Sequence, residues 1–150
     1  MTVTIPAGGG WVDTGVKVTP ADLVTITAAG SWTPDGVNQA GPDGLPDSIV
    51  SADNYFNLAD LGVCAVCATT KDPHWAMLIS YTGNAPPGVG SYTSTAVRSQ
   101  AMVIGGVGSH YHDPWPYPGK LWLGFNDDAY SGNTSDNSGQ VTATITVKRS

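Results

Sequence analysis

Hydrophobic and polar residues alternate along several stretches of this 150-residue chain. In the clearest stretch, residues 140–148, Val141, Ala143, Ile145 and Val147 alternate with three threonines. A period of two residues is typical of a β-strand with one buried face, because successive side chains point to opposite sides. This stretch is therefore predicted to be a half-buried strand.

Other segments show the same period or a short apolar run bounded by Gly, Pro, Asn or Asp. Gly30 is expected to end one of these strands. Loops are expected at residues 31–47 and 109–119, and a helical turn at 53–61. The further predicted strands are residues 3–6, 11–18 with a kink at Gly15, 23–29, 76–81, 101–107 and 120–125. The pattern predicts one domain, residues 1–150, folded as an all-β antiparallel sandwich of the jelly-roll kind.

Composition agrees with short strands joined by turns. Charged residues make up 12% of the chain, and there are 19 Gly and 11 Pro. Six scattered Lys and Arg cannot form a basic patch, so nucleic acid is not an expected partner. No apolar run reaches the roughly 18 residues of a membrane span, so no membrane insertion is expected.

The acidic residues point to metal chemistry in loops. All 12 are aspartate, the acid most common in turns, and the net charge is −6. The segment 126–139 (NDDAYSGNTSDNSG) lies between two predicted strands and carries three Asp and three Asn. Ca²⁺ takes six to eight oxygen ligands from carboxylates, amides and backbone carbonyls. The segment contains no His or Cys, which disfavours zinc and copper. It is predicted to bind Ca²⁺; a long polar hairpin is the alternative.

The stretches LWLGFNDD and DNSGQVTATITV resemble the calcium-loop signature of the PA-I-type bacterial galactophilic lectins. PADLVTITAAGSW with GVNQAGPDG, and MLISYTGN, resemble an upstream strand and loop and a central strand of that family. The resemblance covers roughly residues 11–45, 77–90 and 119–147. It implies a β-sandwich lectin that binds galactose-type glycans through vicinal hydroxyls placed on a calcium ion.

The resemblance also implies a ligand set. Asp127 corresponds to the first side-chain ligand, and Asp136 and Asn137 to the later ones. The spacer is longer than in those lectins, so a backbone carbonyl is expected from Asn133 or Ser131. A second carbonyl is expected from the first long loop, at Pro34.

The expected carbohydrate contacts surround this ion. They are Asp35, Asp47, Trp75, Asp127, Asp128 and Asp136. The chain lacks the family's aromatic residue near Pro34 and its His-Pro-x-Gln element, of which Leu45-Pro46-Asp47 is the nearest remnant. Calcium is therefore better supported than galactose.

Other candidate sites have simpler interpretations. Cys64 and Cys67 form a C-x-x-C without a second pair or a βαβ context, which favours a local disulfide or two buried thiols. A metal site from His74, His110, His112 and Asp113 is disfavoured by the surrounding prolines. Trp115 and Tyr117 are expected to pack on the sandwich, stack on a sugar or form a subunit contact. Trp11, Trp32 and Trp122 are expected in the core or on a sheet face.

The expected function is calcium-dependent carbohydrate binding without enzymatic activity. Carboxylates bound to calcium stay ionised and cannot serve as the acid of a glycosidase. The alternatives are a calcium-stabilised structural, adhesion or self-assembly domain and an accessory module of a glycoside hydrolase. Residues 1–11 lack the features of a signal peptide, so export by another route or an excised module is expected. An extracellular or cell-surface location and a possible homo-oligomer complete the prediction.

Overall fold

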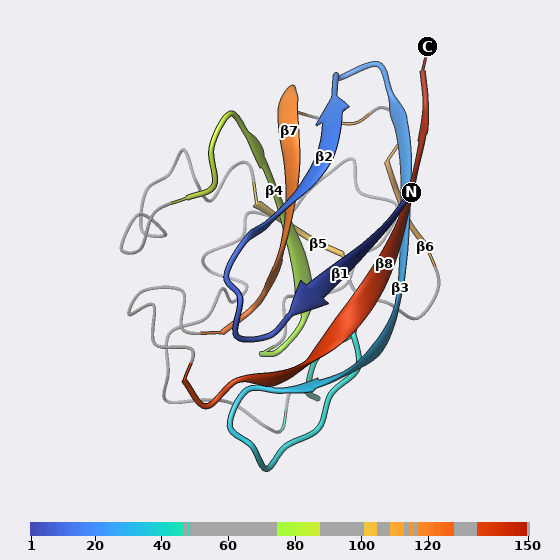
Figure 1. The fold of residues 1–150 in the computed structure, drawn as a ribbon. Helices are drawn as coiled ribbons and strands as arrows, with labels where there is room; N and C mark the ends of the chain where they lie inside the picture. The colour runs from blue at the N-terminus through green and yellow to red at the C-terminus, as the bar shows by residue number, and fades with distance from the viewer. Residues whose placement is uncertain are drawn as a thin grey trace.

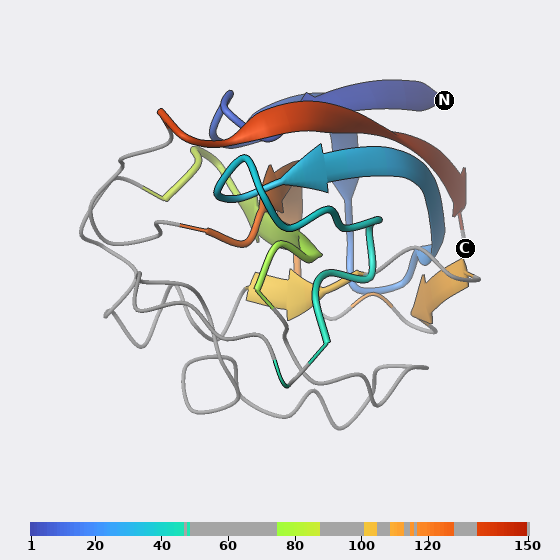
Figure 2. The same ribbon diagram turned by 90° about the horizontal axis from the view of Figure 1, so that it is seen from below.

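The chain folds into two four-stranded antiparallel sheets that face each other (Figure 1). The computed structural model describes residues 1–46, 48, 75–87, 101–104, 109–112, 115, 117–127 and 135–149. One sheet has the order β1 (Thr2–Pro6), β8 (Ser138–Lys148), β3 (Leu23–Thr33), β6 (Ser109–His112). The other has the order β2 (Val12–Val18), β7 (Gly119–Phe125), β4 (Leu78–Gly83), β5 (Ala101–Val103). Figure 2 shows the layers from below. The predicted antiparallel β-sandwich is confirmed, and the described residues include no helix that could cross a membrane.

The longest ladder joins β3 to β8. It runs without interruption from the pair Leu23–Lys148 to the pair Thr33–Ser138. The apolar members of the alternating pattern face the core, and Val24, Ile26 and Ile145 are at most 2% exposed. Full burial of one such side chain stabilises the fold by about 1.5–3 kcal/mol. The period of two seen in the sequence is thus the inner face of this sheet.

The expectation that a strand ends at Gly30 is wrong, because β3 continues to Thr33. Gly30 has a φ of 134° and pairs with Val141 of β8. A Cβ added there would lie 2.7 Å from the carbonyl oxygen of Gln140 and 2.8 Å from the Val141 Cα. The glycine therefore marks a close approach of two backbones rather than a turn.

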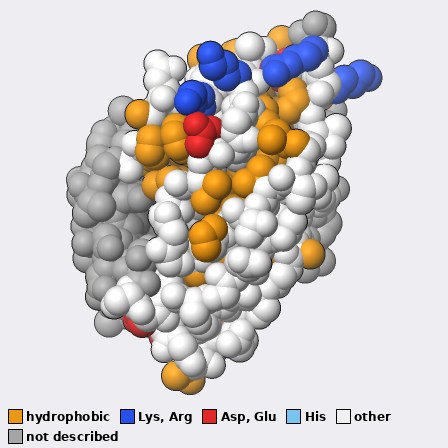
Figure 3. Space-filling model, viewed as in Figure 1, with side chains coloured by type: hydrophobic (Ala, Val, Ile, Leu, Met, Phe, Trp, Pro, Cys, Tyr) orange, Lys and Arg blue, Asp and Glu red, His pale blue; other side chains and the backbone are white. Residues whose placement is uncertain are grey.

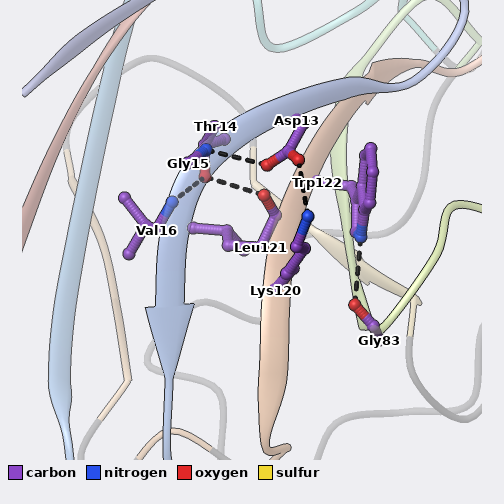
Figure 4. Close-up of polar contacts among 8 residues, drawn as sticks. All are labelled: Asp13, Thr14, Gly15, Val16, Gly83, Lys120, Leu121 and Trp122. Atoms are coloured by element: carbon purple, nitrogen blue, oxygen red, sulfur yellow. Dashed lines mark hydrogen bonds and ion pairs between the residues drawn. The ribbon is translucent and has the colours of Figure 1, made fainter.

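β2 has an irregular register against β7 between Asp13 and Lys17. Figure 4 shows how local hydrogen bonds stabilise it. The Gly15 amide donates to Asp13 Oδ1 at 2.8 Å, and Thr14 Oγ1 donates to the Leu121 carbonyl at 2.7 Å. The predicted kink at Gly15 is confirmed as this bulge.

Three other boundaries also differ from the prediction. Residues 109–112, expected in a loop, form strand β6 and pair with β3. The strand expected at 76–81 is instead β4, Leu78–Gly83, because Ala76 has a positive φ of 63° and lies outside the strand. β5 ends at Val103, before the predicted 107. The predicted helical turn at 53–61 lies outside the described residues.

The expected core or sheet-face positions of Trp11, Trp32 and Trp122 are confirmed. Trp32 and Trp122 are 1% and 9% exposed, and Trp11 is half-buried over Gly124 of β7. Trp115 is fully buried, and its indole N–H donates to Thr82 Oγ1 at 3.3 Å. Of the three expectations for Trp115, packing on the sandwich is the one observed.

The sandwich has two chemically different ends. At one, β2 ends, β7 begins, and Asp22 lies beside Arg149; we call this the Asp22 end. At the other, β3 and β7 end and β8 begins, beside Asp127 and Asn137; we call this the Asp127 end. The N-terminal ammonium group donates to the Ile145 carbonyl at 2.7 Å, so both chain termini lie toward the Asp22 end (Figure 1).

Candidate functional site

Two buried polar residues follow directly after β7. Asn126 is fully buried and Asp127 is 5% exposed. The Ala76 amide donates to the Asn126 carbonyl at 2.9 Å, and the Asn126 amide donates to the Met77 carbonyl at 3.0 Å. The segment 75–77 therefore runs alongside the end of β7 and fixes the backbone that carries Asp127.

The Asp127 carboxylate accepts a short hydrogen bond from a tryptophan. The indole Nε1 of Trp75 lies 2.6 Å from Asp127 Oδ1, and both side chains are buried. A hydrogen bond to an ionised acceptor is shorter and stronger than one between neutral groups. An indole donates a proton but carries no formal charge, so this contact orients the carboxylate without adding a positive charge beside it.

Asn137, immediately before β8, carries a buried oxygen with unmet bonding capacity. Its side chain is 9% exposed, and Nδ2 donates to the Ala7 carbonyl at 3.4 Å. Its Oδ1 atom is buried and has no hydrogen-bond partner within the part of the chain that the structure describes. Leaving a buried acceptor unsatisfied costs about 1–3 kcal/mol. A bound cation would recover this cost.

The first long loop leaves β3 at the same end. Thr33 pairs with Ser138, so the next residues outward are Pro34 and Asn137. Pro34 is buried. Its position fits the prediction that this loop supplies a backbone carbonyl to the site, and that role stays a prediction.

Asp35 uses its carboxylate to close its own loop. Oδ1 accepts hydrogen bonds from the amides of Val37 and Asn38 at 2.8 and 2.7 Å, and Oδ2 accepts one from Asn38 Nδ2 at 2.6 Å. Burial acts to raise the pKa of Asp35, but these hydrogen bonds outweigh it and hold the pKa below its usual value. Asp35 thus stays ionised and shapes the loop; its contact with a carbohydrate stays a prediction.

Trp32 joins the first loop to the rest of the Asp127 end. Its indole N–H lies 3.2 Å from the Gly41 carbonyl and 2.8 Å from the Ala76 carbonyl. Its ring meets Phe125 edge-on, with 4.4 Å between centroids. Sequence reasoning missed this linking role, because Trp32 and Ala76 are far apart in the chain and no local signal connects them.

The charges of the described residues are segregated between the two ends. Figure 3 shows the Lys and Arg side chains gathered along one edge, at the Asp22 end. Two of them form ion pairs there, Lys120 with Asp13 at 3.1 Å and Arg149 with Asp22. The described basic residues are Lys17, Lys120, Lys148 and Arg149, and none of these four lies at the Asp127 end.

The structure brings three predicted ligand residues to one end of the sandwich: Pro34, Asp127 and Asn137. Asp136 lies beside them and is exposed. Trp75, predicted as a carbohydrate contact, is 6% exposed and contacts Asp127. Outside the described residues lie Asp47, Asp128, Ser131 and Asn133, and likewise Cys64, Cys67, His74 and Asp113.

The described candidate donors at this end are the Asp127 carboxylate, the Asn137 amide oxygen and the backbone carbonyl of the buried residue Pro34. Hard oxygen donors of this kind suit Ca²⁺. Among the described residues, no group of three or more His, Cys, Asp or Glu side chains forms a metal site, so carbonyl and amide oxygens would have to complete the shell. The residues present thus fit a calcium site built largely from neutral oxygens and one or two carboxylates.

Comparison with known proteins supports the fold. The sequence matches no protein-family model and no curated protein. The structure is similar to a solved structure described as the EclA N-terminal domain, a PllA-like lectin. The TM-score is 0.60 at 17% sequence identity, and the likeness covers 98% of this chain and 95% of that one. The two domains share their fold over nearly their whole length.

Proposed function

We propose that this chain is a calcium-dependent carbohydrate-binding domain, a lectin without enzymatic activity. The observation that carries the proposal is the Asn137 amide oxygen, buried without a hydrogen-bond partner among the described residues at the end that holds the Asp127 carboxylate. The likeness to a PllA-like lectin domain supports it independently, because lectins of that fold place carbohydrate binding on the same kind of scaffold.

In this proposal, Asp127 and Asn137 are the side-chain ligands of the ion, with Asp136 as a further carboxylate. Pro34 and either Asn133 or Ser131 supply backbone carbonyls. The bound ion offers coordination positions to neutral hydroxyl oxygens. Asp127 carries the negative charge, and the backbone bonds to residues 76 and 77 hold it in place. Carboxylate oxygens at the site also accept hydrogen bonds from sugar hydroxyls, which favours vicinal diols.

Galactose or a related sugar is the proposed ligand class, and Asp35, Asp47, Asp128 and Trp75 are the proposed surroundings of the sugar. A single calcium-coordinated sugar binds weakly, so several copies acting together, as in a homo-oligomer, would raise the avidity. An extracellular or cell-surface location agrees with this ligand class.

The proposal is tested on immobilised galactose and on a glycan array, with Ca²⁺ and with EGTA. Retention is expected with Ca²⁺ and is expected to disappear with chelator. The Asp13→Asn variant, altered at the ion pair with Lys120, should be retained like the wild type. Sugar binding that persists in EGTA would overturn the calcium mechanism.

A structural calcium site is the second candidate, favoured by the low exposure of both side-chain ligands, 5% for Asp127 and 9% for Asn137. An ion held this deeply would brace the loops of a structural, adhesion or self-assembly domain. It would raise the unfolding free energy by about 2.7 kcal/mol at 100 times Kd, yet no glycan would be retained. Melting curves and glycan retention, both measured with and without EGTA, separate the two candidates.

A further inference from the structure

Trp75 has a role that neither core packing nor sugar stacking explains. Its ring is 6% exposed, and its N–H is directed at Asp127 Oδ1 with a separation of 2.6 Å. Other buried tryptophans donate to neutral acceptors. The Trp115 indole donates to Thr82 Oγ1 at 3.3 Å, and Trp122, which is 9% exposed, donates to the Gly83 carbonyl at 3.1 Å.

The backbone beside Trp75 adopts a strained conformation. Ala76 has a φ of 63°, the only non-glycine residue with positive φ in the described part of the chain. Such a conformation costs about 1–3 kcal/mol and persists only where the surroundings enforce it. Here the Ala76 amide donates to the Asn126 carbonyl, and its carbonyl accepts from Trp32. Ala76 thus lies between Trp75 and the start of β4. Its amide hydrogen bond to Asn126 ties the segment of Trp75 to the backbone that carries Asp127.

Trp75 is also fixed from its other side. Its carbonyl accepts a hydrogen bond from the Leu45 amide at 2.8 Å. The backbone of Ala76 is anchored at both its amide and its carbonyl. Because the Trp75 ring is only 6% exposed, the surrounding side chains confine the indole beside the carboxylate. A hydrogen bond from a rigid neutral donor orients a carboxylate without cancelling its charge.

We propose that Trp75 is a positioning residue for the cation: through its indole N–H it holds the Asp127 carboxylate in the orientation that binds Ca²⁺. This inference rests on the proposed calcium site and adds a residue that acts through a ligand rather than as one. Partners of this kind, hydrogen-bonded to metal ligands, typically contribute 10–100-fold to metal affinity.

The test compares Trp75→Phe with Trp122→Phe. Each substitution removes one indole N–H and keeps a ring in a mostly buried site, but only Trp75 contacts Asp127. Calorimetric titration of the purified chain with CaCl₂ is expected to show a Kd at least about 10-fold higher for Trp75→Phe. Trp122→Phe is expected to keep the wild-type Kd, even if its melting temperature falls.

A second measurement needs no variant at position 75. The indole N–H resonances of the wild type, followed by NMR during a CaCl₂ titration, should include one that shifts and saturates with the calorimetric Kd. This resonance should also be displaced in calcium-free Asp127→Asn, whereas the Trp122 resonance should move in neither experiment.

The outcomes separate this inference from the proposed function. A wild type that takes up no Ca²⁺ overturns both. A wild type that binds Ca²⁺, together with a folded Trp75→Phe of equal Kd, overturns the role of Trp75 alone. If Trp75→Phe does not fold, the NMR experiment decides. The role of Trp75 is then overturned if no indole N–H resonance shifts with Ca²⁺ and none is displaced in Asp127→Asn.

Discussion

Each end of the sandwich buries one aspartate, and the two aspartates have different partners. At the Asp22 end, Asp22 is 2% exposed and accepts hydrogen bonds from the Thr19 amide at 2.8 Å and from the Arg149 guanidinium. At the Asp127 end, Asp127 is 5% exposed and accepts its hydrogen bond from the neutral Trp75 indole. The Arg149 donor to Asp22 is a cation of the same chain, whereas the Trp75 donor to Asp127 supplies orientation without charge.

The Arg149 pair shows a structural use of a buried aspartate. A buried charge is costly unless it is paired, so the Arg149 pair completes the Asp22 end. The four described basic residues all lie at that end. The comparison teaches that burial alone does not distinguish the two aspartates, whereas their described hydrogen-bond donors do.

The largest effect on stability is expected from a substitution that forces β3 and β8 apart, because their ladder joins the two ends of the sandwich. Gly30→Ala would place a Cβ against the β8 backbone at a φ of 134°. Backbone strain and overpacking together should lower the unfolding free energy by about 2–6 kcal/mol. Gly15→Ala is the control, because its φ is also positive but its Cβ would meet open space. Urea denaturation measures both, and an equal loss in the two variants would contradict the role of the close approach.

The next effect is confined to the Asp127 end. Asp127→Asn keeps the shape and the oxygen that accepts from Trp75 but removes the charge. The Kd for Ca²⁺ should rise by at least about 100-fold, the upper end of what a neighbour of a metal ligand contributes. Titration calorimetry checks this, with Asp22→Asn at the other end as the matched control. If the control loses calcium affinity equally, the two ends are not functionally distinct.

A pH effect is expected at the Asp22 end. Burial acts to raise the pKa of Asp22, but the hydrogen bonds from Thr19 and the Arg149 charge outweigh it, and the pKa lies below the usual value of 3.8. A carboxylate with a lowered folded pKa contributes stability that is present above its unfolded pKa. That stability is lost as pH falls from about 5 through 3.8 toward the folded pKa.

The variant Asp22→Asn tests this. It should melt below the wild type at pH 7, and the difference should shrink as the pH falls through that window. Thermal melts in EGTA from pH 7 to 3 measure the difference without any contribution from calcium. A difference that stays constant with pH would mean that Asp22 stabilises the fold through its shape and not its charge.

The smallest effect is expected at Ala76. Ala76→Gly relieves a positive φ worth roughly 1–2 kcal/mol but loses a buried methyl group worth about 0.8 kcal/mol and makes the unfolded chain freer. The unfolding free energy should change by less than about 1 kcal/mol in either direction. Ala143→Gly, equally buried but in an ordinary strand, should cost about 1–2 kcal/mol. If Ala76→Gly lowered the unfolding free energy as much as Ala143→Gly does, the conformation of Ala76 would not be strained.

The strands were predictable because their signal is local. Alternation in residues 140–148 and 23–29 reports one buried face, and both segments lie in the central ladder. The strand end predicted at Gly30 was wrong because a glycine that ends a strand cannot be told from sequence from one that lets a neighbouring backbone approach closely. The loop predicted at residues 109–112 was wrong because the prolines that follow suggest a loop, whereas these residues pair with β3 as a strand.

The candidate site was predictable in part for a similar reason. Asp127 and Asn137 flank one loop, so their ligand pattern is visible in the sequence. Trp75 lies 52 residues from Asp127, and only the register of β4 against β7 brings the two together. The positive φ of Ala76 has no sequence signal, because alanine rarely adopts it.

The position of the chain termini has a consequence for how the domain can be tethered. The N-terminus bonds to the Ile145 carbonyl and the chain ends after β8, so both termini leave the sandwich away from the Asp127 end. A linker at either terminus would therefore leave the loops around Asp127 facing outward. The domain is suited to coupling to a sensor surface or to a fusion partner through either terminus, with the candidate site directed into solution.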